Sequence, residues 1–155
     1  MATSVELFHQ QERGKQVATG TERIGGIRVE RVEDLATVCE AAFNSGDLEG
    51  VAGLYEAGAV LVEAPGQATE GLDAIRESLA RFLATKAIVR ITTSSIEQVG
   101  GLALSSYEWT LDATDADGNP ATMGGPGAAV HRRQPDGRWL VVIDNPFAFA
   151  GVMGS

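Results

Sequence analysis

Apolar side chains recur at helical spacing in the first half of the chain. Three segments have this pattern, at residues 33–43, 48–55 and 72–83. Asp47 precedes the second segment and is a typical helix N-cap residue. In the first segment the apolar residues fall at i, i+3, i+4, i+7 and i+8 and share one helical face; they are Leu35, Val38, Cys39, Ala42 and Phe43. The pattern predicts three helices, with Tyr55 on the buried side of the second.

The second half of the chain has the composition of β-strands. Residues 88–99 and 104–113 are rich in β-branched and aromatic residues, and further strands are expected up to Arg133 and over residues 139–145. One more strand, at residues 59–64, falls between the second and third helices. Helices followed by a run of antiparallel strands are typical of an α+β fold, in which the helices cover one face of a strongly bent sheet.

The N-terminal segment differs from the rest because it is polar and has no sustained apolar stripe. A short helix over residues 5–16 is one interpretation. The segment is either a loose tail or an arm that lies on a partner subunit. We expect an N-terminal arm at residues 1–31, a single domain at 32–150 and a tail at 151–155, because 155 residues suffice for one core and not for two ordinary domains.

Charge and composition exclude several classes of partner. The chain is 44% hydrophobic and 21% charged, as soluble globular proteins are, and its formal net charge is −9. An acidic chain repels phosphate backbones, and only Arg132 and Arg133 form an adjacent basic pair. No apolar run approaches the roughly 18 residues that span a bilayer, and the N-terminal segment lacks the layout of a secretory signal. We expect a cytoplasmic protein with no nucleic-acid and no membrane partner.

The residue inventory also argues against metals and cofactors. The chain has one cysteine, Cys39, and two histidines far apart in the sequence, His9 and His131. Sets of cysteine and histidine are the usual ligands of transition metals. The glycine-rich run at 124–127 leads into a strand and not into a helix N-terminus, where a phosphate would bind. We therefore expect no metal, no nucleotide and no other cofactor.

Three groups of motifs, in a fixed order, resemble a known family. They are AAFNSGDL at 41–48 with the strand VLVE at 60–63; EGLDAIR at 70–76; and VHRRQPDGRW at 130–139, which runs into DNP at 144–146. Together they resemble the NTF2-like superfamily, and within it the SnoaL-like and DUF4440 group, which includes the SgcJ/EcaC-type proteins of polyketide and enediyne clusters. The resemblance covers residues 33–148. It implies a cone of helices against a bent sheet, a pocket for an apolar small molecule, and usually a homodimer.

The known chemistries of this superfamily do not map directly onto the chain. By resemblance, ketosteroid isomerases place a tyrosyl donor, a carboxylate base and a second acidic donor where this chain has Cys39, Ala64 and Ala129. Alanine has no donor and a thiol is a weak one. The Asp-Arg-Asp set of the epoxide hydrolases is not recognisable here, and the paired histidines of the dehydratases would require more than His131. We expect no ketosteroid isomerase activity.

His131 and Asp144 are the strongest candidates for chemistry. They flank the turn at 135–138, and side chains alternate with a period of two along strands. Whether the turn has two or four residues, Ala129 and His131 share a face with Val142 and Asp144. Because the position of Ala129 faces the pocket in the resembled family, we predict that His131 and Asp144 point inward, about 5.5–8 Å apart at their Cβ atoms. His131 would transfer protons and Asp144 would orient it. The alternatives are a packed sheet histidine and an aspartate that ties down the chain end.

Two functions remain open. The first is a cyclase-, isomerase- or dehydratase-type enzyme that acts by general acid–base chemistry on a polyketide-like or other apolar carbonyl substrate. The second is a module that binds or sequesters such a molecule without reaction. Both require an apolar small-molecule ligand, for which the predicted binding residues are Tyr55, Glu63, Phe82, Trp109, Asn145 and Phe147.

The sequence leaves the orientation of one strand face open. Tyr107 and Trp109 share a face, which lines either the pocket or a dimer interface. The β-branched positions Ile91, Thr93 and Val141 are expected to be exposed and favour a homodimer formed through the sheet.

Overall fold

The computed structural model describes residues 27–150 of the chain. The helix expected over residues 5–16, most of the N-terminal arm, and the tail at 151–155 lie outside the described residues. Within residues 27–150, a short 3-10 turn, η2 (Val32–Asp34), leads into the helices α2 (Leu35–Asn44), α3 (Leu48–Ala52) and α4 (Leu72–Ala84). The strands of this part of the chain are β1 (Tyr55–Ala64), β2 (Gln67–Glu70), β3 (Ile88–Val99), β4 (Leu102–Thr114), β5 (Pro120–Arg133) and β6 (Trp139–Asn145).

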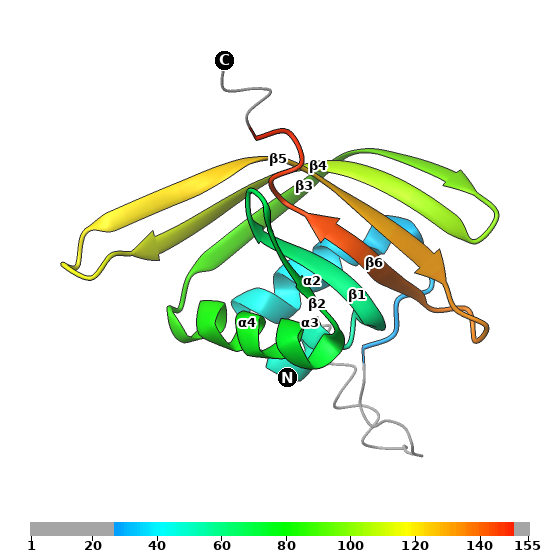
Figure 1. Cartoon of the computed structure of the whole chain (residues 1–155), viewed down its shortest axis with the longest axis horizontal. Helices are drawn as coiled ribbons and strands as arrows, with labels where there is room; N and C mark the ends of the chain where they lie inside the picture. Colours follow the sequence, from blue (N-terminus) through cyan, green and yellow to red (C-terminus); the bar gives the residue numbers. More distant parts are fainter. Residues whose placement is uncertain (1–26, 151–155) are drawn as a thin grey trace.

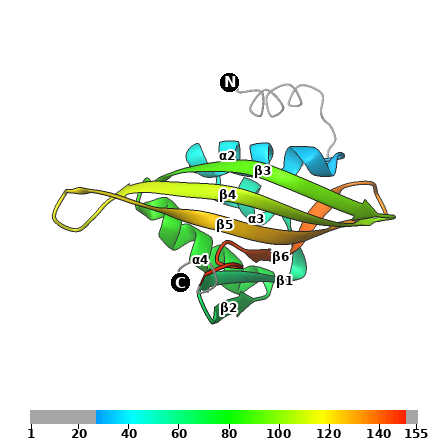
Figure 2. The same ribbon diagram turned by 90° about the horizontal axis from the view of Figure 1, so that it is seen from above.

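The strands form one curved sheet in the order β2-β1-β6-β5-β4-β3. β1 runs parallel to β6, and the other neighbouring pairs are antiparallel. The long strands β3, β4 and β5 arch over α2, α3 and α4, which lie together on one side of the sheet (Figure 1). The view from above has β1 and β2 at one edge of the sheet and β3 near the other (Figure 2). The α+β architecture predicted from the sequence is confirmed.

The second helix is shorter, and the first strand longer, than the apolar spacing predicts. The side chain of Asp47 caps α3 as expected, but the helix ends at Ala52. Tyr55 begins β1 and pairs with Val141 of β6, whose N–H donates to the carbonyl of Leu54 at 2.7 Å. Pairing with a strand near the end of the chain therefore overrides the local helical spacing. Tyr55 is a strand residue, and its placement on a helix was wrong.

The core lies between the helices and the sheet. Its most deeply buried side chains include Val51 of α3, Leu54 before β1 and Ile75 of α4, each at most 1% exposed. α4 contacts both α3 and β1, and α2 contacts β3, so the helices are anchored at two edges of the sheet. No helix in the described part of the chain is long and apolar enough to cross a bilayer. The space enclosed beneath the arch of the sheet is where the candidate site lies.

Candidate functional site

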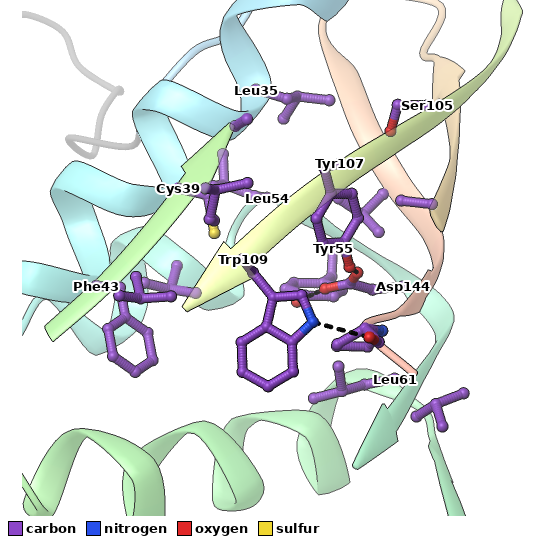
Figure 3. Close-up of a pocket in the computed structure, with 18 of the residues that line it drawn as sticks. Leu35, Cys39, Phe43, Leu54, Tyr55, Leu61, Ser105, Tyr107, Trp109 and Asp144 are labelled. Atoms are coloured by element: carbon purple, nitrogen blue, oxygen red, sulfur yellow. Dashed lines mark hydrogen bonds between the residues drawn. The ribbon is translucent and has the colours of Figure 1, made fainter. Parts of the chain in front are cut away.

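A cavity of about 250 Å³ lies between the helices and the concave face of the sheet. Its wall is mostly apolar and includes Leu35, Leu54 and Leu61 (Figure 3). Among the described residues that line the cavity there is no lysine or arginine. Over residues 27–150, no group of three or more His, Cys, Asp or Glu side chains is placed to hold a metal ion. The cavity therefore suits a neutral, largely apolar molecule.

One carboxylate in this wall is held by two tyrosines. The hydroxyl of Tyr107 donates to Asp144 Oδ1 at 2.6 Å, and the hydroxyl of Tyr55 donates to Asp144 Oδ2 at 3.0 Å. The residues come from β4, β1 and β6, and their polar ends converge in the cavity (Figure 3). Each carboxylate oxygen thus has its own phenol donor, which compensates part of the cost of removing the charge from water. We call these residues the carboxylate–tyrosine cluster.

Burial sets the protonation of this cluster. Burial raises the pKa of Asp144 above its ordinary value, while the hydrogen bonds from Tyr107 and Tyr55 act in the opposite direction. Burial, and next the charge of Asp144, raise the pKa of both tyrosines, so the phenols stay protonated. Burial and the charge of Asp144 also raise the pKa of the Cys39 thiol to about 12. The cluster therefore contains one group suited to taking up a proton, Asp144, beside neutral donors.

Tyr107 reaches Asp144 because the neighbouring strand has a glycine opposite it. Gly127 of β5 pairs with Tyr107 of β4. A Cβ atom at Gly127 would lie 2.7 Å from Cζ of Tyr107 and 2.9 Å from Cα of Pro146. Both distances are too short for non-bonded carbon atoms. Any side chain here would push the tyrosine ring or the chain after β6 out of position.

Gly127→Ala is expected to lower the free energy of unfolding by roughly 1–3 kcal/mol, which is typical of overpacking. Urea denaturation measures this change. The matched control is Gly101→Ala, because a Cβ there would lie no closer than 3.6 Å to the neighbouring atoms. If the two variants unfold at the same urea concentration, the close packing of Tyr107 on β5 is contradicted.

His131 lies in the same wall, but its hydrogen-bond partner is Ser105 and not the predicted Asp144. The residue is 7% exposed, and its Nε2 lies 2.9 Å from Oγ of Ser105 on β4. Its Nδ1 is buried and has no hydrogen-bond partner among the described residues. Burial lowers the pKa of the imidazole to about 4, so the ring is neutral at neutral pH. Asp144, the partner expected for His131, bonds to Tyr55 and Tyr107 instead.

A register shift between β5 and β6 changes which residues face the cavity. Ala129 pairs with Asp144, but His131 pairs with Val141, so β6 contains one extra residue between these pairs. A bulge of this kind breaks the strict alternation of side chains along a strand. As a result Val141, and not Val142, lines the cavity with Asp144. The expectation that Val142 shares the inward face was wrong for this reason.

The other predicted binding residues divide between the wall and its surroundings. Phe82 lines the cavity, as do Trp109 and Phe147, whose ring centroids lie 5.6 Å apart in an edge-to-face arrangement. Nε1 of Trp109 donates to the carbonyl of Pro146 at 2.8 Å, which fixes the indole (Figure 3). Asn145 is outside the lining: its Oδ1 accepts from the N–H of Phe147 at 3.0 Å and stabilises the turn after β6.

Glu63 lines the cavity, but its carboxylate already interacts with other side chains of the protein. The hydroxyl of Thr69 donates to its carboxylate, and Nη2 of Arg81 lies 3.6 Å from Oε1. The hydrogen bond from Thr69, with smaller contributions from Ser78 and Arg81, lowers the pKa of Glu63. Glu63 therefore stays ionised near neutral pH and is less suited than Asp144 to exchanging a proton.

The sequence analysis left open whether Tyr107 lines the pocket or a dimer interface, and it did not select Ser105; both line the cavity. They precede Trp109 by two and four residues on β4, and positions two apart share a face of a strand. All three line the cavity and follow one another along β4 (Figure 3). The periodicity was visible in the sequence, but the direction of the face was not.

Comparisons with known proteins agree with this architecture. No curated protein sequence matches the chain. A ketosteroid isomerase-like protein from Erwinia carotovora atroseptica superposes with a TM-score of 0.64 at 21% identity, over 73% of this chain and 89% of that one. An NTF2-like superfamily protein from Salmonella enterica superposes with a TM-score of 0.65 at 16% identity, over 74% and 85%. A proposed dehydratase of the NTF2-like family from Streptomyces avermitilis does so with a TM-score of 0.65 at 18% identity, over 75% and 92%.

At these identities the structural likeness shows the fold alone. The sequence itself carries the assignment to a family. The family model of the SnoaL-like domain matches residues 36–142, which is more than half of the chain and includes both Tyr55 and Tyr107. The protein therefore belongs to the SnoaL-like family, and its fold is the one seen in proteins of the NTF2-like superfamily.

Proposed function

We propose that the protein is an enzyme that binds a neutral, largely apolar carbonyl compound and transfers a proton at the carbon next to the carbonyl. The observation that carries the proposal is the hydrogen bonding of Asp144 by Tyr55 and Tyr107 in a largely apolar cavity. A carboxylate whose pKa is raised by burial is a better base at neutral pH than one in water. Cyclases and isomerases of polyketide-like compounds need such a group.

The proposed step begins with Asp144 ionised. One carboxylate oxygen takes a proton from the carbon next to the carbonyl, and the electrons of the broken C–H bond move onto the carbonyl oxygen to form an enolate. Once protonated, Asp144 no longer attracts both phenol hydrogens. The hydroxyl of Tyr55 or Tyr107 is then free to donate to the enolate oxygen. Return of the proton to the same carbon gives exchange, and its return to another carbon gives isomerisation.

This proposal changes the roles predicted for His131 and Asp144. The sequence analysis made His131 the proton-transfer group and Asp144 its orienting partner. An imidazole with a pKa near 4 and a hydrogen bond to Ser105 accepts a proton poorly at neutral pH. We therefore assign the proton transfer to Asp144 and leave His131 a role in binding.

A binding module without catalysis is the second candidate. The observation that favours it is that both phenols already donate to Asp144, while of the neighbouring lining residues Ala129 has no polar side-chain group and the neutral thiol of Cys39 is only a weak donor. Such a wall can hold an apolar molecule without stabilising the charge that develops in a reaction.

The two candidates predict different results with a simple ketone. The bicyclic ketone 2-tetralone has exchangeable protons next to its carbonyl and is almost entirely apolar. NMR in D₂O measures the rate at which these protons are replaced by deuterium. The enzyme proposal predicts that the protein accelerates exchange above the buffer rate. Binding of the ketone with exchange no faster than in buffer would reject the enzyme in favour of the binding module.

A homodimer is also part of the proposal, but through different residues from those first expected. Ile91, Thr93 and Val141 were predicted to be exposed. Thr93 is exposed, but Ile91 is half-buried and Val141 is buried, and all three lie on the face of the sheet that lines the cavity. On the opposite face of the sheet, Leu104 and Ile143 are 49% and 41% exposed. Both pair with Val130, so the three residues form one apolar row across β4, β5 and β6.

Light scattering at micromolar concentration is expected to give a mass of twice 16.2 kDa for the wild type. Leu104→Glu should shift the protein to the single-chain mass, because a dimer interface does not accommodate an unpaired charge. Ile88→Glu is the control, because Ile88 is 40% exposed but lies at the start of β3, away from this row. A wild-type protein with the mass of one chain would contradict the dimer.

A further inference from the structure

Ser105 and His131 form a second polar position in the wall of the cavity. Both side chains line the cavity, and they are 6% and 7% exposed. Ser105 Oγ and His131 Nε2 lie 2.9 Å apart, while His131 Nδ1 has no hydrogen-bond partner among the described residues. A buried polar atom without a partner destabilises a folded protein, so a cavity-lining position of this kind is suited to a ligand.

Ser105 and Asp144 lie on strands that are two positions apart in the sheet. Ser105 pairs with Ala129 across β4 and β5, and Ala129 pairs with Asp144 across β5 and β6. The three residues therefore form one row across the sheet. Two strand separations correspond to about 10 Å between the backbones of Ser105 and Asp144. Only the methyl group of Ala129 stands between them in this row, which leaves room for a ligand to lie across it.

The charges of the wall restrict what can bind there. No lysine or arginine is among the described lining residues, and the lining already contains the carboxylates of Glu63 and Asp144. Burial keeps the imidazole of His131 neutral near pH 7. A carboxylate or phosphate on the ligand would therefore be buried without a counter-charge, at a high cost. A hydroxyl or carbonyl oxygen requires no counter-charge and can bond to Nδ1 or to the serine hydroxyl, according to the tautomer of the ring.

We propose that Ser105 and His131 form a second subsite, which hydrogen-bonds a neutral hydroxyl or carbonyl group of the same ligand whose reactive carbonyl meets Asp144. This inference rests on the proposed function for the position of the reactive carbonyl. It narrows the substrate class to elongated apolar molecules with two neutral polar groups at opposite ends.

The test compares 2-tetralone with 6-hydroxy-2-tetralone, which carries an additional hydroxyl on the ring far from the ketone. Calorimetry or NMR titration gives the dissociation constant of each compound. The wild type is expected to bind the hydroxylated compound about 3–10-fold more tightly, the gain typical of one added hydrogen bond. The preference should disappear in Ser105→Ala and in His131→Phe. Ser106→Ala is the matched control and should keep it, because Ser106 bonds to Ser95 and is outside the lining.

A second measurement on the wild type does not depend on the folding of a variant. The ¹⁵N chemical shift of His131 Nδ1 should move on addition of 6-hydroxy-2-tetralone and not on addition of 2-tetralone. His9 is the only other histidine of the chain, so the signal that remains in His9→Gln belongs to His131, and the cavity wall itself is not altered. Equal affinity of the wild type for both compounds, or an unchanged preference in His131→Phe, would overturn the second subsite.

The same two compounds test the second subsite and the proposed catalytic role of Asp144 independently of each other. Asp144→Asn should weaken or leave unchanged the binding of both ketones while keeping the preference for the hydroxyl. A preference that depends on His131, together with exchange no faster than in buffer, would retain the second subsite and reject the catalytic role of Asp144. Accelerated exchange without any preference would retain the catalytic role and reject the subsite.

Discussion

Asp144→Asn is expected to lower the rate of deuterium exchange into 2-tetralone by about 10²–10⁴-fold, which is typical for the loss of a general acid–base group. Asparagine has nearly the same shape but cannot accept a proton from carbon. In the wild type the rate should rise as the pH rises through the raised pKa of Asp144, because only the ionised carboxylate is a base. NMR measures both effects in D₂O.

The control for this prediction is Asp112→Asn, since Asp112 is an exposed residue of β4 that bonds to Thr122. This variant should exchange at the wild-type rate. If Asp144→Asn also retains that rate, the carboxylate–tyrosine cluster is not the catalytic group.

The stability of Asp144→Asn is expected to distinguish loss of chemistry from loss of fold. The pKa of Asp144 is raised in the folded protein above the unfolded value, which is about 3.9. Between these two values the folded state binds more protons, so the free energy of unfolding of the wild type falls as the pH rises. Asparagine does not ionise, so the variant does not lose this part of the free energy of unfolding as the pH rises. Urea denaturation should find the variant at least as stable as the wild type at pH 7, with any advantage smaller near pH 3.

Ile75→Ala is expected to lower the free energy of unfolding by about 2–5 kcal/mol, the usual cost of removing a large aliphatic side chain from a core. Ile75 is 0% exposed and belongs to the core between the helices and the sheet. It lies outside the lining of the cavity, so the variant tests the packing of α4 without altering the wall that meets the ligand. Urea denaturation followed by circular dichroism measures the change.

Ile88→Ala is the matched control, because the same atoms are removed from a residue that is 40% exposed. Its effect should stay within about 1 kcal/mol, as expected for a surface position in a strand. Equal effects of the two substitutions would mean that α4 is not packed on the sheet as described.

The local pattern of apolar residues was sufficient to predict the order of elements. The helical face of Leu35 and Ala42, the N-cap at Asp47 and the long β-rich segments depend on residues close together in the sequence. The helical spacing gave a wrong prediction at Tyr55, which is a strand residue paired with Val141 of β6. Short-range periodicity cannot report a hydrogen-bonded neighbour that lies so far along the chain, and tertiary pairing overrides it.

The candidate site depends still more on the tertiary structure. The sequence alone could single out Asp144 and His131 as rare polar residues in apolar strands, but not their partners. Those partners, Tyr55, Tyr107 and Ser105, come from strands whose register and bulge are set by long-range pairing. A single extra residue in β6 reverses the face of every following side chain, and no local signal marks it. The sequence thus determined the fold and the chemical inventory of the pocket, while the packing of the sheet decided which groups meet there.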